Sequence, residues 1–166
     1  MEQDFIDRVI KQWRSERPDL DAQAIAVVSR ILRLAGHLER RANEALKSFD
    51  LPIWGFDVLA TLRRHGAPYS MTPTELLRST TLTSGAMTNR IDRLEELGLV
   101  AREADPDDRR SLRVKLTPSG LALIDQTTPV RFAEAKDALR GISRAEEKAL
   151  ADLLRKLLLT LEKQST

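Results

Sequence analysis

The hydrophobic period of the sequence changes near residue 99, and this change most constrains the fold. Most of the preceding chain repeats apolar residues every three or four positions, which is typical of amphipathic helices. Residues 99–103 and 112–116 instead alternate apolar and polar side chains, the pattern of half-buried strands. Between them, residues 104–111 are mostly charged and include Pro106. The sequence therefore predicts a two-stranded hairpin with a long polar tip inside an otherwise helical chain.

Two short helices are expected directly before this hairpin. Thr72-Pro73-Thr74-Glu75 combines a threonine cap, a proline at the first helical position and a glutamate three residues after the cap, so a helix should run to about Arg78. A second helix should begin near Thr83 and end at Gly98. Helix, turn, helix and hairpin in this order form the winged-helix plan, in which the second helix enters a major groove of DNA and the hairpin reaches phosphates or a minor groove.

Long helices are expected on both sides of this lobe. Residues 21–49 contain no proline and carry a wide apolar face, Pro52 should open a helix through Leu62, and a helix from Pro118 should bend at Pro129 and end at Gly141. The last helix, after a Ser143–Glu146 capping box, carries a continuous apolar stripe: Leu150, Leu153, Leu154, Leu157, Leu158 and Leu161.

Two such apolar faces exceed what one small domain can bury, which favours a two-fold homodimer over an intramolecular bundle, the alternative. The fold class is therefore mainly α (α+β), a winged helix-turn-helix with long N- and C-terminal dimerisation helices. Residues 1–50 would serve dimerisation and a ligand pocket, residues 51–117 would bind DNA, and residues 118–166 would complete the dimer.

Composition excludes several kinds of chemistry. The 166 residues contain no cysteine and two histidines, which removes disulfides, thiolate metal sites and cysteine catalysis and disfavours a histidine metal site. Neither a glycine-flanked nucleophile nor a phosphate-binding glycine loop occurs, and Asp57 with His65 is too little for a catalytic pair. We expect no catalytic residue, metal or cofactor, no membrane span or signal peptide, and a cytoplasmic location.

The second helix of the expected helix-turn-helix separates its side chains by type. On a helical wheel Met87, Ile91 and Leu94 share the buried side. The outward side offers small or polar groups that could contact bases and phosphates: Ser84, Gly85, Thr88, Asn89 and Arg93. A solvated helix face would carry similar residues. A protein–protein interaction module, the alternative function, would instead need an apolar patch here.

The net charge of +2 says little about nucleic acid, so the electrostatic argument is local. Four cations and no acid lie between residues 109 and 115: Arg109, Arg110, Arg113 and Lys115. Asp105, Asp107 and Asp108 precede them. A carboxylate close to an arginine can hold its guanidinium extended for entry into a minor groove. A solvated charged turn is the alternative interpretation.

The run DPDDRRSLRVKLTPSG resembles the wing motif of the MarR family of bacterial transcription regulators, through Asp108, Arg110, Leu116 and Thr117. The resemblance extends from about Asp21 to the C-terminus. It implies a homodimer that binds a palindromic operator on double-stranded DNA. It also implies that Arg110 enters the minor groove and that Asp108 braces it.

A narrower resemblance concerns a small-molecule effector. An N-terminal helix with Trp13, the Asp57 before Val58-Leu59, and Arg90 on the second helix resemble the urate-responsive branch of that family, whose pocket asparagine is replaced here by His65. An aromatic wall, a carboxylate and a guanidinium could hold a flat, anionic effector. Alternatively, Trp13 anchors packing, Asp57 and Arg90 form a structural ion pair, and His65 is a cation at a helix end.

Overall fold

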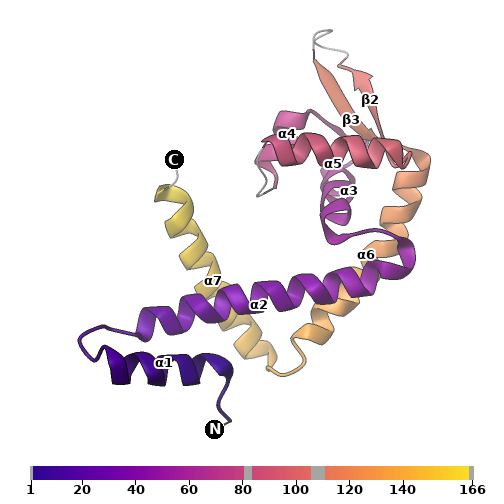
Figure 1. The fold of residues 1–166 in the computed structure, drawn as a ribbon. Coiled ribbons are helices and arrows are strands. Elements are labelled where there is room, and N and C mark those ends of the chain that lie inside the picture. Colours follow the sequence, from indigo (N-terminus) through magenta and orange to yellow (C-terminus); the bar gives the residue numbers. More distant parts are fainter. Residues whose placement is uncertain (1, 81–83, 106–110, 165–166) are drawn as a thin grey trace. The chain divides into compact units, whose positions relative to one another are not determined.

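The computed structural model describes residues 2–80, 84–105 and 111–164. Its chain forms two compact units, Met1–Ile53 and Trp54–Thr166. The first unit contains helices only, and the second contains helices and a small sheet (Figure 1). No helix within the described ranges is both long enough and apolar enough to cross a membrane.

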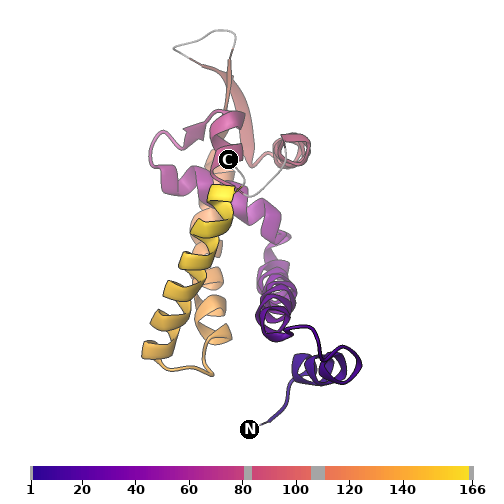
Figure 2. The ribbon, with the colours of Figure 1, turned by 90° about the vertical axis from the view of Figure 1, so that its left-hand side faces the viewer.

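The N-terminal unit is built from α1 (Phe5–Glu16) and α2 (Gln23–Leu46), which lie side by side (Figures 1 and 2). Ile6 and Ile10 of α1 are buried in a small apolar cluster with Ala22. The expected helix over residues 21–49 is therefore present, but its last turn, Lys47–Phe49, is a 3₁₀ helix. Asp50 ends it in a left-handed conformation, with φ at 49°.

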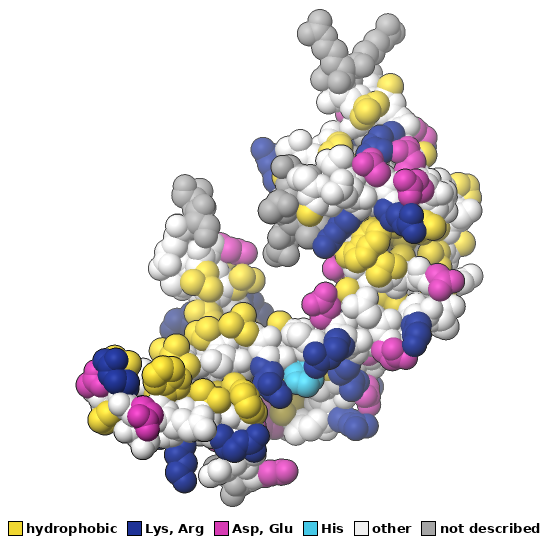
Figure 3. Space-filling model, in the orientation of Figure 1, with side chains coloured by type: hydrophobic (Ala, Val, Ile, Leu, Met, Phe, Trp, Pro, Cys, Tyr) yellow, Lys and Arg dark blue, Asp and Glu magenta, His cyan; other side chains and the backbone are white. Residues whose placement is uncertain are grey.

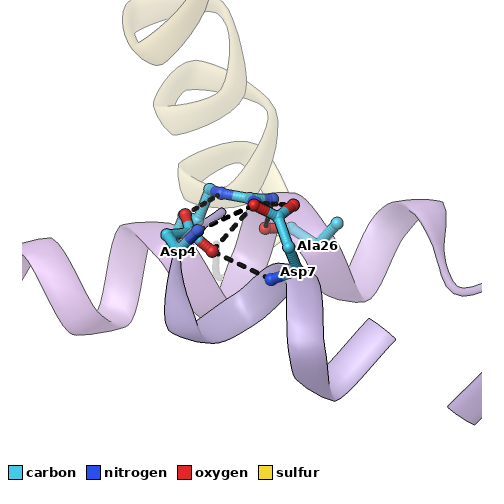
Figure 4. Close-up of polar contacts among 4 residues, drawn as sticks. Asp4, Asp7 and Ala26 are labelled. Carbon is cyan, nitrogen blue, oxygen red and sulfur yellow. Dashed lines mark hydrogen bonds and ion pairs between the residues drawn. The ribbon is translucent and has the colours of Figure 1, made fainter. Parts of the chain in front are cut away.

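Arg30 of α2 holds the start of α1 in place. Its guanidinium donates to Asp4 at 2.9 Å, to Asp7 at 2.6 Å and to the carbonyl of Ala26 at 3.2 Å (Figure 4). Asp4 and Asp7 also form a capping box that opens α1. The arginine therefore joins the cap of one helix to the flank of the other.

The second unit contains the winged-helix lobe. Helix α3 (Ile53–His65) leads to β1 (Ser70–Met71), the short helix α4 (Pro73–Arg78) and α5 (Ser84–Glu96). Strands β2 (Val100–Ala104) and β3 (Leu112–Leu116) form the expected antiparallel hairpin, with Val100 opposite Leu116. The Thr72–Glu75 capping box opens α4 as predicted, with Glu75 N donating to Thr72 Oγ1.

The predicted hairpin is part of a larger sheet, whose third strand the sequence analysis did not identify. The sheet has three strands in the order β1-β3-β2, because β1 pairs Ser70 with Lys115 and Met71 with Val114. A strand of two residues is too short to show an alternating pattern, so periodicity could not reveal it. Strand β1 joins the wing to the segment that leads into α4.

The corner between α5 and β2 is hydrogen-bonded to the start of α6 (Pro118–Ala138). Gly98 has φ at +67°, and Leu99 N donates to Leu94 O at 2.9 Å, which closes α5 with a Schellman motif. Thr117 caps α6 and also donates through Oγ1 to Gly98 O at 2.7 Å. The helix therefore begins against the end of α5.

Helices α6 and α7 complete the unit. Pro129 lies inside α6 without ending it, and α6 stops at Ala138 rather than at Gly141. Helix α7 (Arg144–Gln164) begins at the predicted capping box, with Ser143 N donating to Glu146 at 2.7 Å. No residue of α7 is buried, and its leucine stripe is exposed. Figure 3 shows hydrophobic side chains gathered on the surface of α7 and on that of the α1–α2 unit.

Candidate nucleic-acid interface

Helix α5 presents the two sides that the helical wheel predicts. Met87, Ile91 and Leu94 are 2%, 1% and 0% exposed and belong to the core of the lobe. The opposite side is exposed and carries Gly85, Thr88, Asn89 and Arg93. Ser84 is the first residue of the helix, and its side chain is not described. One face of α5 is therefore buried and the other offers polar groups to a partner.

The charged side chains of α5 form ion pairs, two of them with an arginine of the wing. Arg102 of β2 donates to Asp92 and Glu95 of α5, so one guanidinium pairs with two carboxylates. The hydrogen bond that Arg102 donates to Asp92 raises the pKa of the guanidinium above its ordinary value, and the bond to Glu95 adds to the effect. Arg93 pairs with Glu96 at 3.1 Å, with both side chains more than 60% exposed. A surface pair of this kind contributes little to stability.

The wing cations divide into two groups. Lys115 pairs with Glu103 across the hairpin at 3.2 Å, and Arg113 pairs with Asp105 at 3.0 Å. These two are therefore engaged within the protein. Asp108 and Arg110 of the wing motif lie outside the described residues, as does Arg109, the other cation expected at the DNA.

Asp57, Trp54 and Arg90 form a second group in the same unit. Asp57 lies one turn after Trp54 on α3, so the two share a helix face. The Arg90 guanidinium carbon lies 5.8 Å from the centre of the Trp54 ring. Asp57 is exposed as a residue, but desolvation by the surrounding helices raises the pKa of its carboxyl despite the opposing charges of Arg131, Arg90 and Arg64. A carboxylate, an aromatic ring and a guanidinium thus occur together.

The expected ligand pocket has two further residues, His65 and Trp13. His65 ends α3, about 12 Å along the helix axis from Asp57. Trp13 belongs to the N-terminal unit and is 50% exposed on α1. A groove between α1 and α2 is lined by Ile10, Lys11 and Arg14 among others, but Trp13 is not one of its lining residues.

The sequence analysis missed Trp54, Arg64 and Arg131 in the surroundings of Asp57. Trp54 could have been found, because it precedes Asp57 by three residues on a predicted helix. Arg131 could not, since only the tertiary structure brings α6 near α3. No cluster of three His, Asp or Glu side chains that could hold a metal ion occurs in the part of the chain that the structure describes.

A buried helix flank, an exposed polar face and an adjoining hairpin define a winged helix-turn-helix protein. Residues 49–111 match the model of the MarR family. The transcriptional regulator PecS of Dickeya dadantii is 34% identical over 149 residues, which cover 90% of each chain. The chain therefore belongs to the MarR family and is a transcriptional regulator rather than an enzyme.

Solved structures agree with this assignment. A mutant MarR from E. coli complexed with operator DNA has a TM-score of 0.74 and 29% identity, and covers 82% of this chain and 97% of its own. The regulator BpsR of Bordetella bronchiseptica has a TM-score of 0.71 and 29% identity over 78% of this chain and 91% of its own. The DNA binding of BpsR is regulated by 6-hydroxynicotinic acid. The urate-responsive branch stays a prediction.

Proposed function

We propose that this regulator represses transcription by binding a palindromic operator as a homodimer. The observation that carries the proposal is the exposed face of α5, where Gly85 leaves room for a close approach and Asn89 offers an amide to base edges. Arg102 ties this helix to the wing strand β2, so the two elements are presented together. A repressor of this kind would act in the cytoplasm, where the chromosome lies.

The dimer is proposed from the exposed apolar helices. Leu153, Leu158 and Leu161 of α7 are more than half exposed, and α2 exposes Leu32 and Leu34 to a similar degree. Apolar surface on this scale is typical of an interface with another subunit. A two-fold dimer would place its two α5 helices in successive major grooves, about 34 Å apart.

Fluorescence anisotropy with duplex DNA from the intergenic region beside the gene tests the proposal. Arg110→Ala and Asn89→Ala should each weaken binding by about 1–3 kcal/mol, and Arg110→Ala should also flatten the salt dependence. Lys136→Ala is the matched control for charge, because Lys136 is exposed and lies about 27 Å along α6 from Pro118. Equal affinities of the three variants and the wild type would refute the proposal that the exposed side of α5 and the wing bind DNA. A monomer that binds no duplex would favour a protein–protein interaction module instead.

We further propose that a flat, anionic effector releases the DNA. Arg90 can donate to a carboxylate or enolate, Asp57 can accept from ring N–H groups, and Trp54 supplies an aromatic surface beside Arg90. Trp13 completes the pocket in the prediction from sequence. The effector acts only through a higher affinity for a form of the dimer that binds DNA poorly, because equal affinity for both forms shifts no equilibrium.

Release of bound duplex by candidate effectors tests this second proposal. Urate and hydroxylated nicotinates are suitable probes, because both are flat and anionic. Trp13→Ala and Asp57→Asn should keep nearly wild-type operator affinity and lose release by a compound that releases the wild type. If both variants still release DNA as fully as the wild type, the effector binds elsewhere. The proposal of operator binding would be unaffected by that result.

A further inference from the structure

Arg113 of β3 is the centre of a polar cluster at the base of the wing. Its guanidinium donates to Asp105 Oδ2 at 3.0 Å, to the carbonyl of Ser70 at 3.0 Å and to Ser70 Oγ at 3.2 Å, and it lies 3.6 Å from Glu75 Oε2. The side chain is only 25% exposed, and that of Asp105 only 8%. The charge counted as a wing cation in the sequence is therefore directed inward.

The partners of Arg113 belong to separate elements of the lobe. Asp105 follows β2, Ser70 is in β1, and Glu75 is in the first turn of α4. Glu75 also accepts from Thr72 N at 2.7 Å, and this backbone hydrogen bond holds the pKa of its carboxyl below the usual range. Asp105 N in turn donates to Ser111 O at 2.9 Å, next to the start of β3. One guanidinium thus connects both wing strands to the start of the helix-turn-helix.

We infer that Arg113 is a positioning residue for DNA binding: with Asp105 it fixes the base of the wing against β1 and α4, and it does not itself contact DNA. The inference rests on the proposed operator binding. A planar guanidinium with a fixed fork of donors suits this task, because it bonds several acceptors in one geometry. A largely buried ion pair is also sensitive to loss of either partner, since the remaining charge stays desolvated. Without it, the wing strands would have to be ordered against β1 and α4 at each binding event.

The opposing interpretation is that Arg113 acts as an ordinary DNA cation. Asp105→Asn separates the two, because they predict opposite signs. Removing a negative charge from the wing should strengthen DNA binding if only charge matters. If Asp105 holds Arg113 and the wing base, the same substitution should weaken binding several-fold. Tighter or unchanged operator binding by the folded Asp105→Asn variant would overturn the inference.

Arg113→Met and Lys115→Met form a matched pair, because both remove one cation from β3. Lys115→Met should lower the slope of log affinity against log salt by no more than about 0.9. Arg113→Met should lose affinity nearly as far as Arg110→Ala does, about 5- to 150-fold, and adding Arg110→Ala to it should cause little further loss. Equal effects of the two methionine variants, or additive effects of Arg113→Met and Arg110→Ala, would contradict a positioning role.

Hydrogen exchange without DNA keeps the inference distinguishable from the proposed operator binding. Backbone amides of β1, β2 and β3 should exchange faster in Asp105→Asn than in the wild type. The amides of the buried α5 residues, Met87, Ile91 and Leu94, should stay protected. Arg113→Lys, which keeps the charge and loses the fork, should show the same change if Asp105→Asn fails to fold. Unchanged exchange in the strands of both variants would overturn the inference even if the wild type binds DNA normally.

Discussion

Gly120→Ala should destabilise the protein even though alanine is the better helix former. A Cβ on Gly120 would lie 1.9 Å from the carbonyl oxygen of Leu99 and 2.9 Å from its carbonyl carbon. That carbonyl accepts from Thr117 N at 3.1 Å, so it cannot move away without losing a bond that holds α6 to the corner after α5. Helix propensity alone would favour alanine by at most about 1 kcal/mol, the value for a helix interior, because Gly120 is in the first turn of α6.

The expected cost follows from these contacts. Overpacking of a tight backbone site costs about 1–3 kcal/mol, and loss of the Thr117–Leu99 hydrogen bond adds about 1 kcal/mol. For a chain of this size, each 1 kcal/mol lowers Tm by roughly 2–4 °C. After subtraction of the roughly 1 kcal/mol by which helix propensity favours alanine, a net cost of about 1–3 kcal/mol remains. We therefore expect Tm to fall by about 2–12 °C. Operator affinity should fall with it, because the corner carries the end of α5.

Thermal unfolding followed by circular dichroism measures the effect, at several protein concentrations because a dimer makes Tm concentration-dependent. Gly141→Ala is the matched control, since a Cβ at Gly141 meets no atom within 4 Å. The control should stay within about 0.5 kcal/mol of the wild type. A Gly120→Ala protein with an unchanged or higher Tm would refute the reasoning.

Further predictions concern the cap of α4, the carboxyl of Asp57 and the dimer. Thr72→Ala removes the side-chain cap that Glu75 N donates to, and should cost about 1 kcal/mol in urea unfolding. Asp57→Asn should raise Tm at pH 7, because a carboxyl whose folded pKa is raised stabilises the fold only while protonated and loses that contribution as pH rises. The difference in Tm between Asp57→Asn and the wild type should disappear below about pH 4. A difference that is constant over pH would exclude ionisation of Asp57 as the cause. Leu157→Glu, on the stripe of α7, should shift sedimentation toward the monomer, whereas an unaltered dimer would exclude that stripe from the interface.

The helices were predictable because the signals that begin and end them are local. The capping boxes at Thr72 and Ser143 and the turn at Gly98 depend on residues within a few positions of one another. The buried side of α5 followed from helical periodicity alone, with Met87 and Leu94 in the core as expected. The exposed side of α5, the candidate DNA-binding surface, was predictable for the same reason, because it lies opposite the buried side.

Contacts between distant segments were not predictable in this way. The sequence by itself determined the order of helices, the hairpin and the polar face of α5, because each depends on hydrogen bonds and periodicity within one segment. Only the tertiary structure decided that β1 joins the sheet, that Arg113 turns inward to Asp105, and that Leu99 covers Gly120. The sequence shows that a position carries a charge or a small side chain. The residue that contacts this position is in another segment of the chain, and only packing of the folded lobe brings the two together.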